Sequence, residues 1–355
     1  MGINIFAFVI VLGVLIFFHE LGHFLVAKLF GVGVEKFSLG FGPKLFGKTI
    51  GGTDYRLSAI PLGGYVKMTG EEPDTEIDPE DIPLSFTHKH VFKRICIVAA
   101  GPVFNLLLAV IIFFFIFQIS GDFILKPAVG SVEQNSPAEK GGLVKDDLIV
   151  SIDGSPIKSW DEMKTIITDC KGKNINLNVQ RNNDIIAVNI IPRLQTTKNI
   201  FGEDIKRYVI GITASGDILS VDLNIFQAFV KSIKQTYEIS KLTVLSIIKL
   251  IQGSISTKTL GGPIMIAELA GQQAKEGALN LIFFIALLSI NLGILNFLPI
   301  PVLDGGHLLF FFFEAVTGRQ VNTKMREAAQ QVGMVVLILL MIFVFYNDIT
   351  RIFFS

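Results

Sequence analysis

The sequence predicts a polytopic α-helical membrane protein with four transmembrane helices, and three observations indicate this class. Of the 355 residues, 50% are hydrophobic and only 17% are charged, whereas about 25% of the residues in a soluble domain are charged. The apolar residues gather in runs such as 95–119, which reach the roughly 20 residues that a spanning helix needs. Basic and acidic residues number 31 each, so no net positive charge points to a nucleic-acid partner. These observations exclude a soluble enzyme, a disordered chain and a nucleic-acid-binding protein.

Four apolar stretches are long enough to span a bilayer. They are residues 1–30, 95–119, 279–298 and 332–354. The first lacks the basic start and the small-residue cleavage site of a signal peptide, so we expect it to be retained. Polar segments separate the spans: a cytoplasmic loop at 31–94, a long insertion that contains 125–195 and 196–278, and a hairpin loop at 299–331.

The distribution of Lys and Arg predicts the orientation of the spans. The loop 31–94 carries eight basic residues and the loop 299–331 carries three, whereas the tail before the first apolar run carries none. We therefore expect the two basic loops in the cytoplasm, and both termini and the long insertion on the outer side.

The first predicted span contains an H-E-x-x-H motif, His19-Glu20-Leu21-Gly22-His23. His19 lies about 22 Å along a helix from Asn4, in the cytoplasmic third of a hydrocarbon core about 30 Å thick. Ionisable groups at that depth are costly and by default functional. On a helix, the two histidines lie on one face and can share one Zn²⁺, with Glu20 beside the metal as a candidate base. The alternative is a helix end whose polar side chains only meet lipid head groups.

A catalytic zinc site takes three protein ligands and keeps one position open. Asp304, eight residues after Asn296 and followed by two glycines, is the candidate for the third ligand. The first and third spans run in the same direction, so Asp304 comes at the cytoplasmic end, on the side of His19 and His23. Its alternative role is to cap the helix that follows. His307 is a weaker ligand candidate, for which a structural role is expected.

Together these motifs resemble the bacterial site-2 protease family of zinc intramembrane metalloproteases, and most closely its RseP-type regulators of sigma-E proteolysis. The resemblance covers nearly the whole chain and includes the segments 37–44, 59–68, 101–105 and 262–267. It implies a multi-pass protein of the bacterial plasma (inner) membrane that cleaves single-span proteins, such as anti-sigma factors or signal-peptide remnants, in or near the bilayer. It also implies that His19, His23 and Asp304 hold Zn²⁺ and that Glu20 moves the protons of hydrolysis.

Further residues are candidates for substrate binding. Asn296 and Asn291 lie at the inner end of the third span, and the resemblance favours Asn296; either side chain could instead hydrogen-bond between helices. The segment 53–67 reads as a strand, a turn and a strand, and the resemblance implies a membrane-associated β-hairpin that receives the unwound substrate. Gly63 and Gly64 would permit close backbone approach there. A plain cytoplasmic hairpin is the alternative.

The long insertion is predicted to hold a separate module. Residues 125–195 are β-rich with a helix around 160–169, and they resemble one PDZ domain of α+β fold. Such domains bind extended peptide ends by strand addition; the alternative is a structural cover that binds nothing. Within 196–278, apolar residues at helical spacing alternate with lysines, which predicts a linker and an amphipathic helix lying on the lipid bilayer rather than a fifth span.

Two other functions are compatible with polar groups inside a membrane. One is a metal or proton transporter whose His, Glu and Asp line a pathway, although no inverted repeat is evident. The other is an inactive membrane scaffold that presents the PDZ-like domain.

Overall fold

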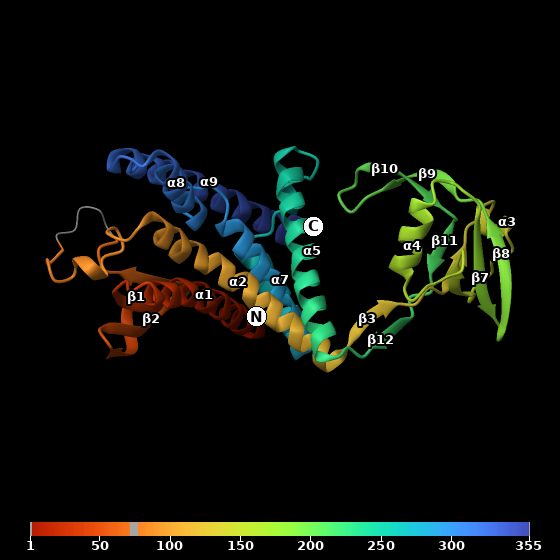
Figure 1. Ribbon diagram of the computed structural model, residues 1–355, viewed down its shortest axis with the longest axis horizontal. Coiled ribbons are helices and arrows are strands. Elements are labelled where there is room, and N and C mark those ends of the chain that lie inside the picture. Colours follow the sequence, from red (N-terminus) through yellow and green to blue (C-terminus); the bar gives the residue numbers. More distant parts are fainter. Residues whose placement is uncertain (1, 72–76, 355) are drawn as a thin grey trace. The chain divides into compact units, whose positions relative to one another are not determined.

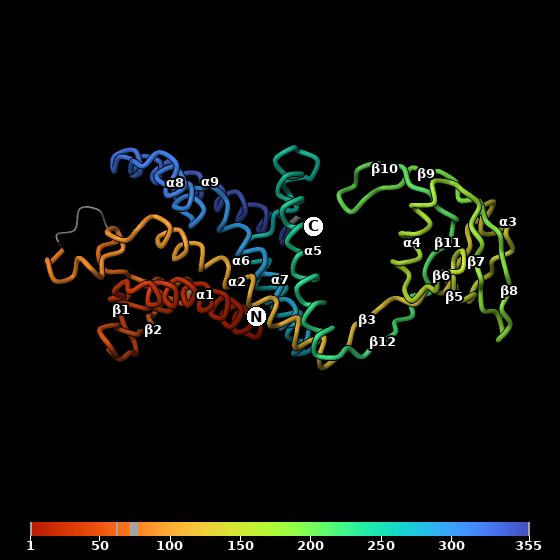
Figure 2. The backbone as a smooth tube through the Cα atoms, viewed as in Figure 1, coloured from red at the N-terminus to blue at the C-terminus, as the bar shows by residue number. Residues whose placement is uncertain are grey.

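The computed structural model describes residues 2–71 and 77–354, so residues 1, 72–76 and 355 of the predicted segments lie outside the description. The chain divides into two compact units, each described here by itself (Figures 1 and 2). The first unit comprises Met1–Ile116, Phe229–Ile248 and Ser256–Ser355, and the second comprises Phe117–Ala228 and Lys249–Ile255.

Four helices of the described chain are long and apolar enough to cross a membrane. They are α1 (Gly2–Leu29), α2 (Val91–Ser120), α7 (Ala278–Asn296) and α9 (Thr323–Phe354). The last begins nine residues before the predicted apolar run at 332, because its first turns are polar but still helical. The predicted loop 299–331 contains a further helix, α8 (Asp304–Thr317).

Helices α1, α2 and α7 share one core. Buried residues of all three helices form a single cluster that includes Val11, Leu108 and Ile285. A Cβ atom on Gly22 would lie 2.4 Å from the carbonyl oxygen of Ala100, so only glycine allows α1 and α2 to approach this closely. This contact places the first half of α2 directly against the H-E-x-x-H segment.

A shorter helix, α6 (Pro263–Glu276), connects α1 with the end of α9. It packs along α1, and its N-terminus is held by Asp348, which is 2% exposed. The carboxylate of Asp348 accepts hydrogen bonds from the amides of Gly262, Ile264 and Met265 at 2.9, 3.0 and 3.2 Å. A carboxylate at this position satisfies amides that have no partner inside the helix and complements the helix dipole.

The first inter-span loop folds into a curled sheet made of β1 (Val34–Ile50) and β2 (Thr53–Met68). The sequence predicts a hairpin within 53–67, but the tight turn lies at Gly51-Gly52, where both residues have positive φ. The first half of β1 pairs with both halves of β2, since Phe37 lies opposite Val66 and also opposite Tyr55. The segments 44–50 and 64–68 therefore form the two outer edges of the sheet, and the segment 64–68 lies against α1. A short 3-10 helix, Ile82–Leu84, follows the sheet.

The second unit contains the helices α3 and α4 and several small sheets around its own core. Its elements are β3 (Asp122–Leu125), β4 (Val129–Val132), α3 (Pro137–Lys140), β5 (Leu148–Ile152), β6 (Ser155–Pro156), α4 (Trp160–Asp169), β7 (Ile175–Arg181), β8 (Asp184–Ile190), β9 (Arg193–Lys198), β10 (Asp204–Val209), β11 (Ile212–Ala214) and β12 (Ile218–Val221). The unit extends beyond the predicted 125–195, because β11 pairs with β4 and β12 pairs with β3.

A buried ion pair holds the second unit together. Asp147 is fully buried and receives two hydrogen bonds from Arg181, at 2.7 and 2.8 Å, and one from the amide of Val144. Burial raises the pKa of Asp147, but the hydrogen bonds from Arg181 and Val144 outweigh it and keep that pKa below its ordinary value. Asp147 is therefore a charged structural residue.

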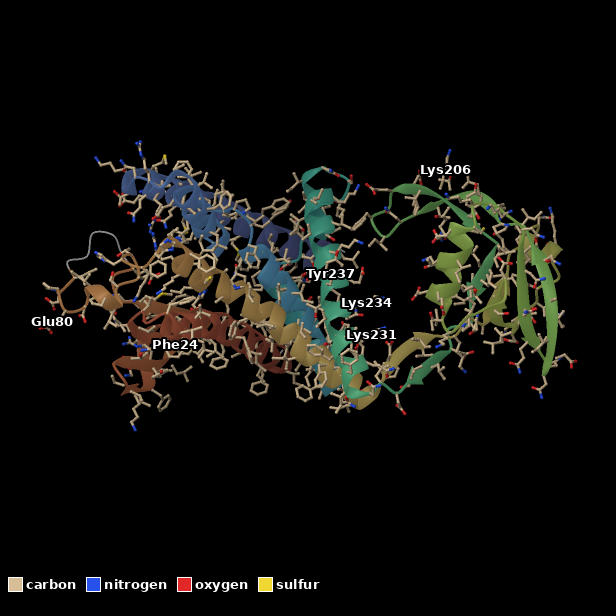
Figure 3. All side chains as sticks on the ribbon, viewed as in Figure 1. Phe24, Glu80, Lys206, Lys231, Lys234 and Tyr237 are labelled. Carbon is tan, nitrogen blue, oxygen red and sulfur yellow. The ribbon has the colours of Figure 1, made fainter. Side chains whose placement is uncertain are left out.

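The predicted amphipathic helix is α5 (Ile225–Ile251), which is not among the four helices apolar enough to span. Lys231, Lys234 and Tyr237 project from it (Figure 3). Its buried side consists of small residues, Ser232 and Thr236 among them. A short 3-10 helix, Thr257–Thr259, precedes α6.

Candidate metal centre

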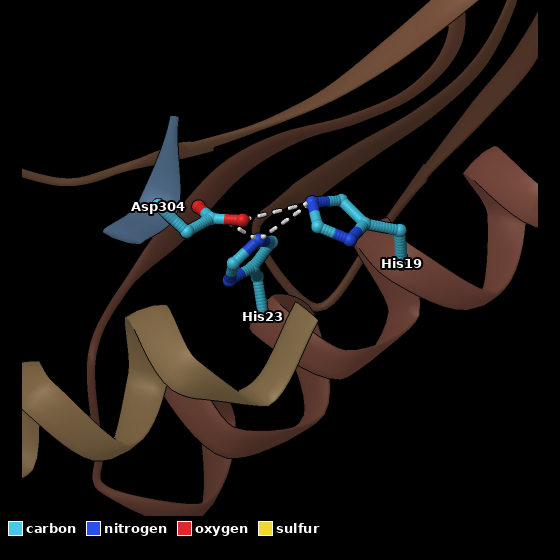
Figure 4. Close-up of side chains that lie close together, drawn as sticks. All are labelled: His19, His23 and Asp304. Atoms are coloured by element: carbon cyan, nitrogen blue, oxygen red, sulfur yellow. Dashed lines mark hydrogen bonds and ion pairs between the residues drawn. The ribbon is translucent and has the colours of Figure 1, made fainter. Parts of the chain in front are cut away.

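Three predicted metal ligands converge at one point (Figure 4). His19 and His23 lie one turn apart on α1, and Asp304 is the first residue of α8. The Nε2 atom of His19 is 3.2 Å from Oδ2 of Asp304 and 3.3 Å from Nε2 of His23. The Nε2 atom of His23 is 3.5 Å from Oδ1 of Asp304. Among the described residues these three side chains form a group whose ligand atoms all lie within 4.8 Å of one another.

This donor set fits a zinc ion. Zinc–ligand distances of about 2.0–2.2 Å in a tetrahedron separate neighbouring ligand atoms by about 3.3–3.6 Å, and the three measured separations of 3.2, 3.3 and 3.5 Å are close to that range. Nδ1 of His23 lies 2.9 Å from the carbonyl oxygen of Ile97. A hydrogen bond to that oxygen requires the hydrogen on Nδ1, so Nε2 of His23 presents a lone pair. With its hydrogen on Nδ1, His23 can therefore donate the Nε2 lone pair to a metal ion held together with His19 and Asp304.

The start of α8 brings Asp304 to the histidines. A Cβ on Gly305 would lie 2.2 Å from the carbonyl oxygen of Leu298, and a Cβ on Gly306 would lie 2.4 Å from that of Ile300. The two glycines therefore let α8 fold back against the end of α7. The N-cap of α8 is Leu303, and Asp304 follows it in the first turn. Its carboxylate faces both histidines, and a negative charge at this position also suits the helix dipole.

The face of α2 that meets α1 is shaped around both imidazole rings. A Cβ on Gly101 would lie 2.3 Å from Nε2 of His23 and 2.8 Å from Cε1 of His19. One turn further, Nδ2 of Asn105 lies 3.3 Å from Nδ1 of His19. Sequence reasoning assigned no role to Gly101 or Asn105; the available signal was a polar side chain inside an apolar span.

Glu20 lies between α1 and the edge of the sheet. The backbone amide of Val66 on β2 hydrogen-bonds to its carboxylate. A Cβ on Gly64 would lie 3.0 Å from Cγ of Glu20 and 2.7 Å from Ile16, so a glycine there lets β2 come close to α1. The predicted base is therefore held next to the metal site by backbone groups of the sheet.

A cavity of about 880 Å³ opens beside the three ligands. Glu20, Gly64, Asp304 and His307 line it, together with the segment 64–68 of β2 and residues of α8 and α9. The cavity is large enough for an extended peptide segment next to the ligands. His307 lies one turn after Asp304, outside the three-residue group.

Of the other predicted substrate-binding residues, Asn296 lies at the site, whereas Asn291 and Gly63 do not. Nδ2 of Asn296 lies 3.4 Å from Nε2 of His19, at the site. Asn291 is hydrogen-bonded at 2.8 Å to Thr243 of α5; five residues correspond to a rotation of about 140° around the helix, so Asn291 faces away from Asn296. A Cβ on Gly63 would point at the ring of Phe41, so Gly63 faces away from Glu20, while Gly64 faces it.

Comparison with known proteins identifies relatives along almost the entire chain. The sequence pattern of peptidase family M50 matches residues 7–340. A protein of Campylobacter jejuni with the name "putative zinc metalloprotease" is 39% identical over 99% of this chain and 94% of its own length. A protein of Mesorhizobium japonicum with the same description is 36% identical over 96% of this chain and 97% of its own length.

Among solved structures, the PDZ domain of an SdrC-like protein from Listeria monocytogenes covers 24% of this chain and 84% of that domain, with 28% identity and a TM-score of 0.20.

The family decides between the functions that the sequence left open. The relatives named "putative zinc metalloprotease" match nearly the whole chain, and the ligand geometry suits zinc, so a metalloprotease is favoured over a transporter or an inactive scaffold. The chain belongs to peptidase family M50, the site-2 proteases, and is a zinc metalloprotease of the membrane.

Proposed function

We propose that this protein is an intramembrane endopeptidase that cleaves single-span membrane proteins, such as anti-sigma factors or signal-peptide remnants, in regulated intramembrane proteolysis. One observation carries the proposal: the three convergent ligand atoms and Glu20 belong to helices embedded among apolar spans, and the cavity beside them is lined by a sheet edge. A site built in this way suits a peptide bond delivered from within the bilayer.

The chemistry can be assigned to residues of the chain. His19, His23 and Asp304 would hold zinc, which when bound acts as a Lewis acid and lowers the pKa of water at its open position. Glu20 accepts the proton of the attacking water and returns it to the leaving amine. Asn296 lies beside His19, where its amide can donate a hydrogen bond to the scissile carbonyl as charge develops. The amide of Val66 keeps the carboxylate of Glu20 in place.

The orientation in the membrane follows from the basic loops. We place the sheet of β1 and β2 and the segment between α7 and α9 on the cytoplasmic side of the bacterial plasma membrane, and the termini and second unit outside. His19 and His23 lie in the second half of α1, which in this orientation is the cytoplasmic half.

Substrate capture is proposed to use the edge of β2. A helical substrate hides its peptide bonds in its own hydrogen bonds, so it must unwind, and strand addition holds an unwound segment. The amides of Val66 and Met68 point to Glu20 and Glu71. Because alternate residues of a strand direct their backbone groups to the same side, the carbonyl oxygens of Gly64, Val66 and Met68 face the cavity rather than β1. An added strand would donate hydrogen bonds to these oxygens, since the amides of Val66 and Met68 are already bonded to Glu20 and Glu71.

Disulfide trapping tests this placement. In a chain with Cys96 and Cys170 replaced by Ser and with Glu20→Gln, we introduce Lys67→Cys on the edge 64–68 that lies against α1, or Lys48→Cys on the opposite edge 44–50 of the same sheet. Side chains paired across strands lie about 4.5–5.5 Å apart at Cβ, so the closest of these pairs reach the separation of about 4.5 Å that a disulfide tolerates. A single-span substrate with a cysteine near its cleavage site should cross-link to position 67 and not to position 48. Equal cross-linking at both positions, or at 48 alone, contradicts strand addition at this edge.

The second unit is proposed to bind peptide ends outside the membrane. A groove of about 600 Å³ lies between α4 and β11 and is lined by Met163, Ile167 and Ile212 among others. Among the described strands, β11 pairs only with β4, so its other edge faces the groove. Gly211, just before β11, directs its carbonyl oxygen to the amide of Glu133 next to β4, and by strand alternation the backbone of Ile212 faces the groove.

The only tryptophan of the chain, Trp160, lines this groove and reports on its occupancy. Titration of the full-length protein with an extended apolar peptide that has a free carboxyl end should change the Trp160 fluorescence in a saturable way. The same peptide with proline at alternate positions cannot donate the hydrogen bonds of an added strand, and it should bind at least tenfold more weakly. Identical fluorescence responses to the two peptides, or no response, would contradict peptide binding by strand addition and favour the alternative of a structural cover that binds nothing.

A further inference from the structure

Asn105 occupies a position that the proposed mechanism does not use. It is fully buried in α2, and its backbone carbonyl receives a hydrogen bond of 2.7 Å from Ser289 of α7. Its Nδ2 atom lies 3.3 Å from Nδ1 of His19, whereas its Oδ1 atom has no hydrogen-bond partner among the described residues. A buried polar atom left without a partner is destabilising, so this arrangement needs a reason.

The contact between Asn105 and His19 depends on which ring nitrogen of His19 carries the hydrogen. Nε2 of His19 is turned toward Asp304 and His23, so as a ligand atom it carries a lone pair and the ring hydrogen is on Nδ1. Two donors, Nδ1 of His19 and Nδ2 of Asn105, would then face each other. Rotating the side-chain amide of Asn105 by 180° exchanges the positions of Oδ1 and Nδ2. Oδ1 then faces Nδ1 of His19 and accepts its hydrogen.

We infer that Asn105 is a positioning residue whose side-chain oxygen accepts the Nδ1 hydrogen of His19 and thereby fixes the tautomer and orientation of that ligand. The inference rests on the proposed role of His19 as a metal ligand. Metal-binding histidines generally donate their second ring hydrogen to an acceptor that sets the orientation of the ring.

The same face of α2 serves both histidines. Ile97, Gly101 and Asn105 follow one another at intervals of four residues, so they lie on one side of the helix. The carbonyl oxygen of Ile97 accepts a hydrogen bond from His23, and the absence of a side chain at Gly101 leaves room for both imidazole rings. Asn105 contacts the remaining ring, that of His19. One helix thus orients two ligands that belong to another.

Asn296 is the competing neighbour of His19. Its Nδ2 atom is 3.5 Å from Nδ1 and 3.4 Å from Nε2 of His19. Lone pairs and hydrogens on the two ring nitrogens point in different directions, so an atom about equally far from both is aligned with neither. Asn105 is the closer neighbour of Nδ1, and its buried position leaves it no solvent partner.

The test measures zinc affinity of the full-length protein by competition with a chelator. Asn105→Leu removes the acceptor at similar volume and should weaken zinc binding about 10–100-fold. Asn105→Asp keeps an oxygen acceptor and should bind zinc within about threefold of the unmodified protein. Asn291→Leu is the matched control, because it removes another interior asparagine of the same unit that does not contact His19. The metal-free proteins with Asn105→Leu and Asn291→Leu should unfold at similar temperatures.

Wild-type affinity in Asn105→Leu would overturn the inference, and so would an equal loss in Asn105→Asp and Asn105→Leu, since the oxygen would then not matter. If Asn105→Leu does not fold, Asn105→Ala replaces it in the same comparison. His19→Ala separates this failure from failure of the proposed function. Zinc lost in His19→Ala but retained in Asn105→Leu rejects only the role of Asn105, whereas zinc retained in His19→Ala rejects the ligand set itself.

Discussion

Glu20→Gln is expected to abolish peptide-bond cleavage without removing zinc. The amide is nearly isosteric with the carboxylate and keeps an oxygen for the amide of Val66, but it cannot accept a proton from water. General acid–base groups contribute roughly 10²–10⁴-fold to a rate, so the rate should fall by about that factor. Cleavage of a single-span substrate by purified protein in detergent or liposomes measures it, with zinc content determined by elemental analysis of the same sample.

The control for this substitution is Glu314→Gln, which changes a carboxylate in the same unit that pairs with Arg94 on α2 and does not line the cavity. It should retain zinc and substantial activity. Cleavage at the unmodified rate in Glu20→Gln would remove Glu20 from the mechanism and leave the protein without an identified base.

Asp304→Asn is expected to lower zinc occupancy as well as activity. Both carboxylate oxygens face the histidines, at 3.2 and 3.5 Å from their Nε2 atoms. The substitution removes the only negative charge of the three-residue group and replaces one oxygen by an amide nitrogen, which is not a zinc ligand. The loss of affinity should exceed the roughly 10–100-fold that changes to outer-shell partners of ligands cause. Chelator competition and elemental analysis measure it.

Asp348→Asn provides the comparison for Asp304→Asn. Asp348 is also a buried carboxylate of the first unit, but it caps α6 and does not approach the histidines. Its substitution should lower thermal stability and leave zinc affinity unchanged. If Asp304→Asn retained full zinc content, the contact between α8 and the histidines would be structural and the third ligand would have to be found elsewhere.

Much of the site follows from local sequence because a helix is periodic. Residues four apart on a helix share a face, so His19 and His23 had to point the same way once α1 formed. Asp304 could be added from topology alone, since parallel spans end on the same side of the bilayer. No such rule was available for Asn105, whose significance depends on α2 packing against α1 at the close contact of Gly22 and Ala100.

The sheet shows where local reasoning failed. Residues 53–67 were predicted as a strand, a turn and a strand, yet β2 continues through them as one curled strand. The turn lies instead at Gly51-Gly52, and the first half of β1 pairs on both sides. Pairing between segments distant in sequence is determined by burial against α1, which no local pattern records.

Asn291 and Asn296 show the same limit within one helix. Their spacing of five residues leaves open which asparagine faces the site, because that depends on the rotation of α7 about its axis. The rotation is set by packing: Ser289 hydrogen-bonds to α2 and Asn291 to α5, which leaves Asn296 beside His19.

By itself, the sequence determined that this protein has four apolar helices, that two histidines share one face of the first with a glutamate beside them, and that an aspartate follows the third. These properties depend on composition and on the helical repeat, which act over a few residues. Tertiary structure alone decided which strand edge borders Glu20, which asparagine reaches His19 and how α2 surrounds both imidazole rings. Those contacts join segments far apart in the chain, and their distances are set by close packing at positions where only glycine or a buried polar group fits.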